Sequence, residues 1–276
     1  MSGTLYLVPT PIGNLGDISK RMADTLERVD FIAAEDTRVT VKLLNHLGIK
    51  KPMTPYHRHN LDTAGPAVLE RLLAGESCAL VTDAGTPAIS DPGEDLVALC
   101  AQAQVPVEAI PGPCALVTAL SVSGLPTGRF TFEGFLPMNR KNRRAQLEQL
   151  REEGRTMVFY EAPHKLTATL DDLRDTFGPG RRVAVCRELT KLHEQVLRTT
   201  LGEAVEHFAQ TPPRGEFVLV VEGAPAPVQQ EGDPRQALER VEQLREQGLS
   251  LKEAAAQAAA EFGMKKRALY DLAVGK

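Results

Sequence analysis

Short apolar runs and amphipathic stretches alternate along the first half of the chain. The apolar runs have the length of buried strands, and proline, glycine or polar residues follow each of them. They lie at 4–8, 29–34, 52–56, 77–81 and 105–110. The stretches between them carry apolar residues at helical spacing, for example Leu96, Val97 and Cys100. This alternation predicts an α/β fold with a mostly parallel sheet and helices on its faces.

The second half alternates less regularly and predicts a mixed sheet. Leu125-Pro126-Thr127-Gly128 has the composition of a domain linker, and residues 130–135 then alternate like a strand. Further strands are expected at 156–160, 182–186, 195–200 and 217–221. Helices are expected in the charged segment after residue 139, at 165–177 and at 203–209. Their spacing mixes crossover and hairpin-like connections, which indicates both parallel and antiparallel pairing.

A third region begins at Pro234. The segment 223–233 before it is rich in proline, glycine and glutamine, which is typical of a flexible connection. Asp233 then occupies an N-cap position, Gly248 ends the first helix, and Ser250 with Glu253 forms a capping box for a second. A third short helix completes either a helix-turn-helix-like module or a packing element. The expected domains are 1–124, 125–223 and 234–276, with a linker at 224–233.

Composition narrows the class of protein. The chain has 276 residues, about two average domains, and it is 42% hydrophobic and 25% charged, as ordinary globular proteins are. It has no run of about 18 apolar residues, and its first residues lack a signal-peptide pattern, so a cytoplasmic protein without a membrane span is expected. The four cysteines lie far apart and are expected to be free, mostly in the core. The net charge of −4 neither indicates nor excludes a nucleic-acid partner.

Three loops that follow expected parallel strands combine proline with glycine and lead into helices. They lie at 9–14, 83–93 and 111–113, and together they would line one crevice at the sheet edge. Pro9 and Pro11 have no N–H, so the first loop is a poor phosphate cradle. Its carbonyl groups suit an ammonium, an adenine amino group or a sulfonium better. A rigid turn is the alternative for this loop taken alone.

Several motifs in order resemble the tetrapyrrole-methylase superfamily, and within it the ribosomal RNA small subunit methyltransferase I family. The resemblance covers nearly the whole chain. It rests on residues 5–15, on Ala33-Ala34-Glu35-Asp36-Thr37-Arg38, on the loop 83–93, on Ser123-Gly124-Leu125-Pro126, on Gly134-Phe135-Leu136-Pro137, on Tyr160-Glu161-Ala162-Pro163-His164 and on Arg187-Glu188-Leu189-Thr190-Lys191.

This resemblance implies two α/β domains with S-adenosylmethionine in the cleft between them. It implies 2′-O-methylation of a cytidine in the decoding region of 16S rRNA, and a homodimer that acts on the RNA or on the assembled small subunit. Methylation of a tetrapyrrole such as a corrin precursor is one alternative. A non-catalytic, cofactor-binding ribosome assembly factor is another. The basic cluster described below and the helical tail favour RNA over a small substrate.

The resemblance also implies which residues contact the cofactor. The superfamily often has Gly-Asp-Pro where this chain has Gly85-Thr86-Pro87, so Asp83 is expected to supply the carboxylate instead. The expected cofactor contacts are Pro9, Ile12, Asp83, Gly85, Thr86, Ile89, Ala115, Leu116, Thr118, Tyr160, Leu189 and Gly215.

Charged residues near these motifs are candidates for the chemistry of the acceptor. We expect the ribose to be surrounded by Glu35, Asp36, Arg38, Glu188 and Lys191. The proton acceptor is left open among Glu35, Asp36, Glu188 and His193. Asp36 has a competing explanation as a helix N-cap, and Glu188 has one as the ion-pair partner of Arg187 or Lys191.

Two basic clusters are candidates for RNA contact, although a solvated helix face is the usual explanation of a charge run. They comprise Arg140, Lys141, Arg143 and Arg144 in the middle of the chain, and Lys265, Lys266 and Arg267 in the tail. The loop His57-Arg58-His59-Asn60 is interpreted as polar and able to touch RNA, with a metal-binding turn as the alternative. No metal site is predicted, because the histidines lack ligand spacing with cysteines or acids.

Overall fold

A computed structural model describes residues 2–225 and 233–275. These residues form two compact units, Met1–Ala224 and Pro225–Lys276. The expected linker falls largely on residues 226–232, which lie outside the described residues.

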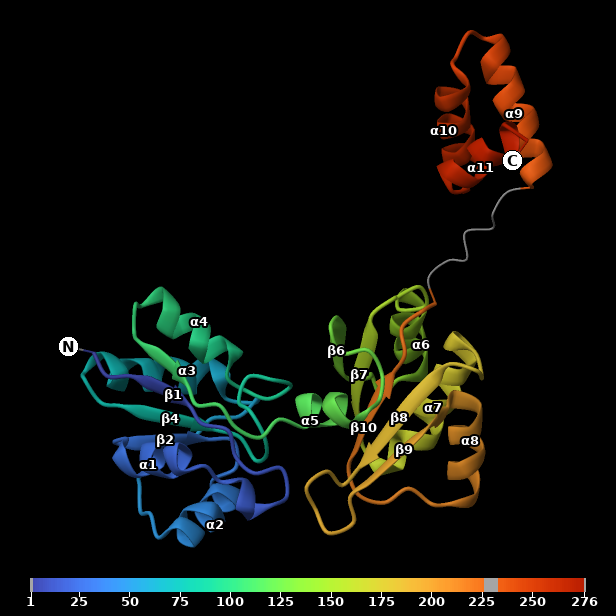
Figure 1. Cartoon of the computed structure of the whole chain (residues 1–276). Coiled ribbons are helices and arrows are strands. Elements are labelled where there is room, and N and C mark those ends of the chain that lie inside the picture. Colours follow the sequence, from blue (N-terminus) through green and yellow to red (C-terminus); the bar gives the residue numbers. More distant parts are fainter. Residues whose placement is uncertain (1, 226–232, 276) are drawn as a thin grey trace. The chain divides into compact units, whose positions relative to one another are not determined.

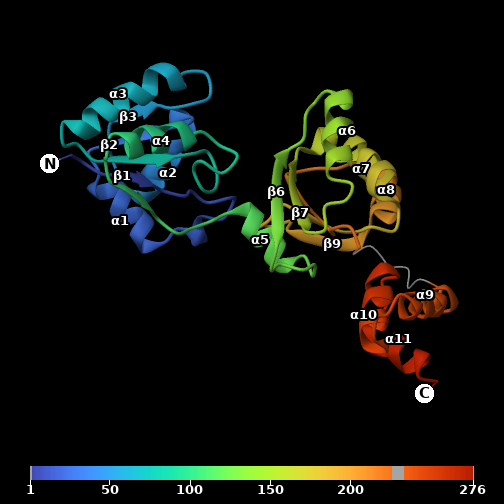
Figure 2. The same cartoon turned by 90° about the horizontal axis from the view of Figure 1, so that it is seen from above.

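The first sheet of the larger unit is wholly parallel, as the alternation predicted (Figure 1). Its strand order is β3-β2-β4-β1-β5. The strands are β1 (Leu5–Leu7), β2 (Phe31–Ala34), β3 (Met53–Pro55), β4 (Cys78–Val81) and β5 (Val107–Ala109). Helices α1 (Lys20–Arg28) and α2 (Thr37–Leu47) cover one face, and α3 (Leu61–Leu73) and α4 (Glu94–Gln102) cover the other (Figures 1 and 2). A short 3₁₀ turn, Leu15–Asp17, follows the first proline loop.

Local signals in the sequence set the bounds of these helices. The Ser19 side chain accepts a hydrogen bond from the Met22 N–H and caps α1, and the Asp36 side chain accepts one from the Arg38 N–H and caps α2. Gly48 ends α2 with a left-handed φ of 71°, which glycine adopts without steric cost. The expected N-cap role of Asp36 is therefore confirmed.

The second sheet of the same unit is mixed, as the irregular spacing predicted. Its order is β6-β7-β10-β8-β9, with β6 and β7 parallel and the other neighbours antiparallel. The strands are β6 (Phe130–Phe135), β7 (Thr156–Glu161), β8 (Arg182–Arg187), β9 (Gln195–Thr200) and β10 (Phe217–Val221). Helices α6 (Arg140–Gln149), α7 (Pro163–Phe177) and α8 (Leu201–Gln210) bury one face of this sheet.

Helix α5 (Ala115–Val122) connects the two sheets (Figure 2). Its buried residues Leu116, Ala119 and Leu120 form one core with strands β7, β8 and β10, so α5 packs on the second sheet. The expected boundary at 124–125 would assign this helix to the first domain by its place in the sequence. By its packing, however, α5 covers the face of the second sheet opposite α6, α7 and α8.

The smaller unit has three helices and a core of its own. These are α9 (Pro234–Glu246), α10 (Leu251–Glu261) and α11 (Lys266–Ala273). Their buried face is formed by Val241, Leu244, Leu269 and the alanines of α10. The capping box of Ser250 and Glu253 begins α10, as predicted. None of the helices in the described ranges combines the length and the hydropathy that a membrane span requires.

Candidate active site

The three proline-containing loops meet at the carboxyl edge of the first sheet. Thr10 and Gly85 exchange two backbone hydrogen bonds, of 2.9 and 3.0 Å. The Thr86 hydroxyl donates to the Pro113 carbonyl at 2.9 Å, which connects the second loop to the third. A Cβ atom on Gly112 would lie 2.4 Å from Cγ of Pro9, so only glycine allows the third loop to approach the first. The expected crevice between these loops is therefore confirmed.

A cavity of about 470 Å³ opens beside these loops and is walled by both sheets of the larger unit. Its volume is within the range of small-molecule and cofactor sites. The first sheet contributes Ile12, Glu35, Asp83, Ala84, Gly85, Thr86, Ile89, Ser90 and Asp91, and α5 with the residue before it contributes Cys114 and Ala115. The second sheet contributes Phe135, Tyr160, Glu161, Ala162, Pro163, Cys186, Leu189, Glu216, Phe217 and Val218.

Tyr160 forms the aromatic wall of this cavity. Its hydroxyl accepts a hydrogen bond of 3.0 Å from the Leu116 N–H, and burial raises the pKa of the phenol. Phe132 and Phe135 pack edge-on against its ring, with centroids 4.9 and 5.5 Å away. Tyr160 is thus fixed from three sides and presents a rigid apolar surface to a ligand.

The carboxylates of Glu35, Asp83 and Asp91 face the cavity from loops that follow β2 and β4. Glu35 accepts a hydrogen bond of 3.3 Å from the Asp83 N–H, and Asp83 accepts one of 3.2 Å from the Asp36 N–H. Burial raises the pKa of each of the three carboxyls, and that of Asp91 rises to about 6. Among the described residues, no hydrogen bond or ion pair is made by the Asp91 side chain. Arg58 donates to the Ser90 carbonyl, and its positive charge partly offsets the rise that burial causes in the pKa of Asp91.

Glu188 and Lys191 form an ion pair at the edge of the cavity. Lys191 Nζ lies 2.8 Å from Glu188 Oε1 and 2.8 Å from Glu216 Oε2. The stem of Lys191 passes over Gly13, where an added Cβ would lie 2.5 Å from its Cγ. Glu188 and Thr190 adopt left-handed φ angles of 51° and 67°, so this loop is strained. The alternative explanation for Glu188, an ion pair with Lys191, is confirmed.

The structure brings many of the residues expected at the cofactor to the cavity wall. Those that line it are Ile12, Asp83, Gly85, Thr86, Ile89, Ala115, Tyr160 and Leu189. The others lie behind this wall: Pro9 packs on Gly112, Leu116 bonds Tyr160 through its N–H, the Thr118 hydroxyl donates to the Cys114 carbonyl, and Gly215 packs on Glu188.

Of the residues expected around the ribose, Glu35 lines the cavity. Asp36 and Arg38 form an exposed bidentate pair outside the cavity wall, and this pair holds the pKa of Asp36 down to about 2. The pair with Lys191 likewise lowers the pKa of Glu188. His193 is exposed and does not line the cavity.

Several lining residues were not expected from the sequence, among them Asp91, Phe135 and Glu216. Asp91 closes the same motif as Asp83, and Phe135 lies in Gly134-Phe135-Leu136-Pro137, so signals for both were present. Glu216 precedes an apolar strand and had no motif to mark it.

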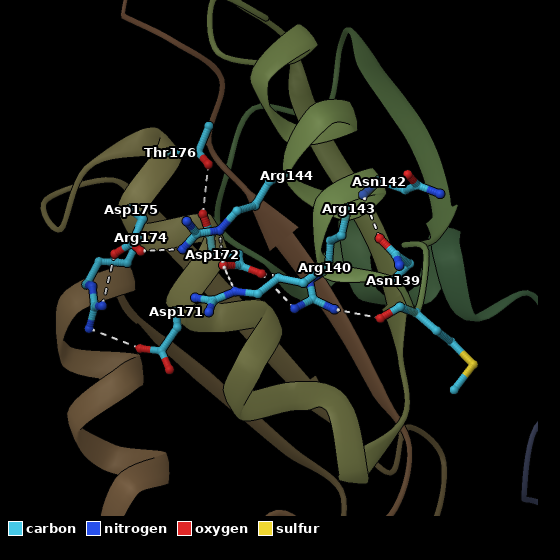
Figure 3. Close-up of polar contacts among 11 residues, drawn as sticks. Asn139, Arg140, Asn142, Arg143, Arg144, Asp171, Asp172, Arg174, Asp175 and Thr176 are labelled. Atoms are coloured by element: carbon cyan, nitrogen blue, oxygen red, sulfur yellow. Dashed lines mark hydrogen bonds and ion pairs between the residues drawn. The ribbon is translucent and has the colours of Figure 1, made fainter.

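The basic cluster at the start of α6 is largely paired within the protein (Figure 3). Arg140, Arg143 and Arg144 all donate to Asp172 of α7, which is fully buried. The Arg143 side chain is only 7% exposed, which is at odds with the expectation that it contacts RNA. Lys141 is exposed, as are Lys265, Lys266 and Arg267 in the smaller unit.

The cavity suits the cofactor that the resemblance implies. Pro9 and Pro11 have no N–H to donate, whereas the cavity presents the carboxylates of Glu35, Asp83 and Asp91 to a cationic ligand. Tyr160, Ile12 and Leu189 supply the apolar surface that an adenosyl group and a thioether chain need. Within residues 2–225 and 233–275, no group of three or more His, Cys, Asp or Glu side chains could hold a metal.

Comparison with known proteins identifies the family. The model of the tetrapyrrole (corrin/porphyrin) methylases matches residues 4–205, and that of the RsmI C-terminal HTH domain matches residues 231–275. The Ribosomal RNA small subunit methyltransferase I of Synechocystis is 47% identical over 99% of this chain and 98% of its own. The protein of the same name from Escherichia coli O157:H7 is 46% identical over 99% of this chain and 95% of its own.

A solved structure shares the fold of the larger unit. Uroporphyrin-III C-methyl transferase from Thermus thermophilus, complexed with S-adenyl homocysteine, has a TM-score of 0.56 and 18% identity. The match covers 80% of this chain and 97% of that one. The chain has the tetrapyrrole-methylase fold, and it belongs to the ribosomal RNA small subunit methyltransferase I family of methyltransferases.

Proposed function

We propose that this chain uses S-adenosylmethionine to methylate the ribose 2′-hydroxyl of a cytidine in the decoding region of 16S rRNA. The observation that carries the proposal is the similarity to named small-subunit rRNA methyltransferases over 99% of the chain, helical unit included. The uroporphyrin methyltransferase covers only 80% of the chain, so it gives no reason for the helical unit. A small tetrapyrrole substrate needs no such unit.

The cofactor supplies a methyl group already activated on a sulfonium, so the protein has mainly to orient the reactants. Carbonyls of the three proline-containing loops and the Asp83 carboxylate suit the cationic parts of the cofactor. Tyr160, held by the Leu116 N–H and by Phe135, forms a fixed wall against its apolar parts. These residues would hold the bound cofactor in one orientation.

A carboxylate in the cavity accepts the proton that the ribose hydroxyl loses. Glu35 and Asp91 suit this role because they line the cavity and burial raises the pKa of both. Asp36 and Glu188 suit it less, because ion pairs with Arg38 and Lys191 lower their pKa values. In this proposal Arg38 and Lys191 contact phosphate or hydroxyl groups of the bound RNA.

The partner in this proposal is small-subunit rRNA, either free or in the assembled subunit. The chain acts as a cytoplasmic homodimer. Lys265, Lys266 and Arg267 begin the last helix of the smaller unit with exposed cations, as an RNA contact requires.

The proposal is tested by offering methyl-labelled S-adenosylmethionine together with small ribosomal subunits that lack the modification, or with uroporphyrinogen III. We expect the label in 16S rRNA and none in the tetrapyrrole. Label in the tetrapyrrole alone would identify a tetrapyrrole methylase. Cofactor binding without transfer to either acceptor would identify a non-catalytic binding factor.

A further inference from the structure

A buried aspartate organises the arginines of α6. Asp172 Oδ2 accepts hydrogen bonds of 2.9 and 2.6 Å from Nε and Nη2 of Arg143. Its Oδ1 accepts from Nε of Arg144 at 2.7 Å and from Nε of Arg140 at 3.2 Å (Figure 3). We call these four residues the Asp172 cluster. Arg143 is buried with Asp172, and it also donates to the Met138 carbonyl at 3.4 Å.

The three arginines of this cluster carry more positive charge than is required to neutralise the single buried carboxylate of Asp172. Arg143 alone places two donors on Asp172, yet two further guanidinium groups bind it. The Arg140 side chain is 64% exposed and that of Arg144 is 47% exposed. Within the described residues, Arg140 uses only Nε, so both of its terminal nitrogens are available. Arg144 also donates through Nη2 to Asp175, which leaves Nη1.

Anchoring an arginine through Nε holds its remaining nitrogens in a fixed direction. A guanidinium is planar, so the position of Nε and the carboxylate plane together fix where Nη1 and Nη2 point. A guanidinium held in this way binds a phosphate at a lower entropic cost, because its side chain is already ordered before binding.

Two exposed apolar side chains belong to the chain segment that leads from the cavity wall to this cluster. Phe135 lines the cavity while 53% exposed, and Met138 is 75% exposed. Arg140 lies five positions after Phe135, so the two Cα atoms are at most about 18 Å apart. Aromatic surfaces beside a row of cations are the usual site for single-stranded nucleic acid, because bases stack while phosphates pair.

We propose that the surface formed by Phe135, Met138, Arg140, Lys141 and Arg144 binds the single-stranded RNA next to the target nucleotide, and that Asp172 is its positioning residue. This inference rests on the proposed RNA substrate. Bases pack on Phe135 and Met138, while Arg140, Lys141 and Arg144 pair with phosphates. Arg143 takes no part in binding, because it is the buried partner of Asp172.

The inference is tested by titrating a fluorescein-labelled single-stranded RNA of the decoding-region sequence against the full-length protein at several salt concentrations. We expect Arg140→Ala and Arg144→Ala each to weaken binding about 5- to 20-fold and to lower the salt slope by about 0.7. Arg151→Ala is the matched control, since Arg151 lies just beyond α6, is 47% exposed and pairs with Glu148. Its loss should leave binding unchanged. Equal binding and slope for all three variants would overturn the proposal.

The Asp172→Asn variant tests whether Asp172 acts on RNA binding by orienting the arginines or only through its charge. This change removes a negative charge, so electrostatics alone predicts tighter RNA binding, whereas loss of orientation predicts weaker binding. If this variant does not fold, Arg140→Lys replaces it. Lysine keeps the positive charge, but its single ammonium group cannot bind Asp172 and present two further donors to a phosphate. Weaker binding than wild type with an unchanged salt slope supports the proposal, and wild-type binding by either variant contradicts it.

Methyl transfer by the wild-type protein, measured in parallel, distinguishes this inference from the proposed function. Transfer to small subunits with no effect of the arginine variants on binding would refute the binding surface alone. Arginine-dependent RNA binding without transfer would refute the proposed function and leave the binding surface.

Discussion

The Tyr160 hydroxyl lies 3.0 Å from the backbone nitrogen of Leu116 and accepts its hydrogen bond. Leu116 is in the first turn of α5, where backbone N–H groups lack partners within the helix. Cys114, at the N-cap position, gives no side-chain cap. Tyr160 therefore caps α5 from the second sheet and joins the helix after the third proline-containing loop to the cavity wall.

Replacing Tyr160 by phenylalanine tests this cap. The ring and its packing on Phe132 and Phe135 remain, while the Leu116 N–H loses its acceptor. We expect a loss of about 1 kcal/mol in the free energy of unfolding, as for other lost helix caps, together with weaker cofactor binding. Urea unfolding and calorimetric titration with S-adenosylhomocysteine measure the two effects. Unchanged stability would show that water replaces the hydroxyl.

The contact between Gly112 and Pro9 gives a second prediction. In Gly112→Ala the new methyl group would meet the proline ring, and both residues are too rigid to yield easily. The loops should separate, with about 1–3 kcal/mol lost in stability and roughly tenfold weaker cofactor binding. Gly128→Ala is the control, because nothing lies within 4 Å of its added Cβ. The explanation fails if both variants bind the cofactor equally.

Asp91 should make methyl transfer depend on pH. Its carboxyl faces Glu35, Asp83, Arg58 and Tyr160, and its pKa lies near 6. A proton acceptor has to be ionised, so the rate should rise with pH through about 6 and then level off. In Asp91→Asn we expect a 10²-fold or greater loss of rate and no such rise. Asp95→Asn, in an exposed position of α4, should behave like the wild type.

The same residue should lower stability above pH 6. The pKa of Asp91 is higher in the folded chain than in the unfolded chain, so the folded state binds more protons between about pH 4 and 6. Its contribution to stability is present below pH 4 and is lost as the pH rises through 6. At pH 8, Asp91→Asn should therefore be more stable than wild type, by at most about 3 kcal/mol. Thermal melts at pH 4 and pH 8 measure this; a loss of stability at pH 8 would contradict it.

Arg143 should behave differently from its exposed neighbours. Arg143→Ala removes two hydrogen bonds from a fully buried carboxylate, and we expect it to cost roughly 2–4 kcal/mol of stability. Arg144→Ala removes a half-exposed partner and should cost much less, because solvent screens its charge. Chemical denaturation of the two variants checks the difference. Equal losses would mean that the three arginines share Asp172 evenly.

Features that depend on a few neighbouring residues could be predicted from the sequence. The caps at Asp36, Asp233 and Ser250 follow from side chains that bond within one helical turn. The crevice of three loops followed from parallel pairing alone, since parallel strands bring their carboxyl ends to one edge.

Features that depend on distant partners could not be predicted in this way. The sequence of the basic cluster does not show that Arg143 is buried on Asp172, about 30 residues later, while Arg140 and Arg144 stay exposed. Helix α5 precedes the linker in sequence, yet its small and apolar face packs on strands β7 and β10. Asp91 belongs to the motif at residues 83–93, but its burial and the absence of a hydrogen-bond partner among the described residues depend on how the loop folds.

The most direct test of the proposed function is where the transferred methyl group sits in the RNA. A methylated ribose 2′-oxygen cannot attack the adjacent phosphodiester, so alkali leaves that bond intact. After transfer of a labelled methyl group to small subunits, we predict that alkaline hydrolysis yields the label in a resistant dinucleotide that begins with cytidine. Label recovered in mononucleotides would place the methyl group on a base and contradict the proposal.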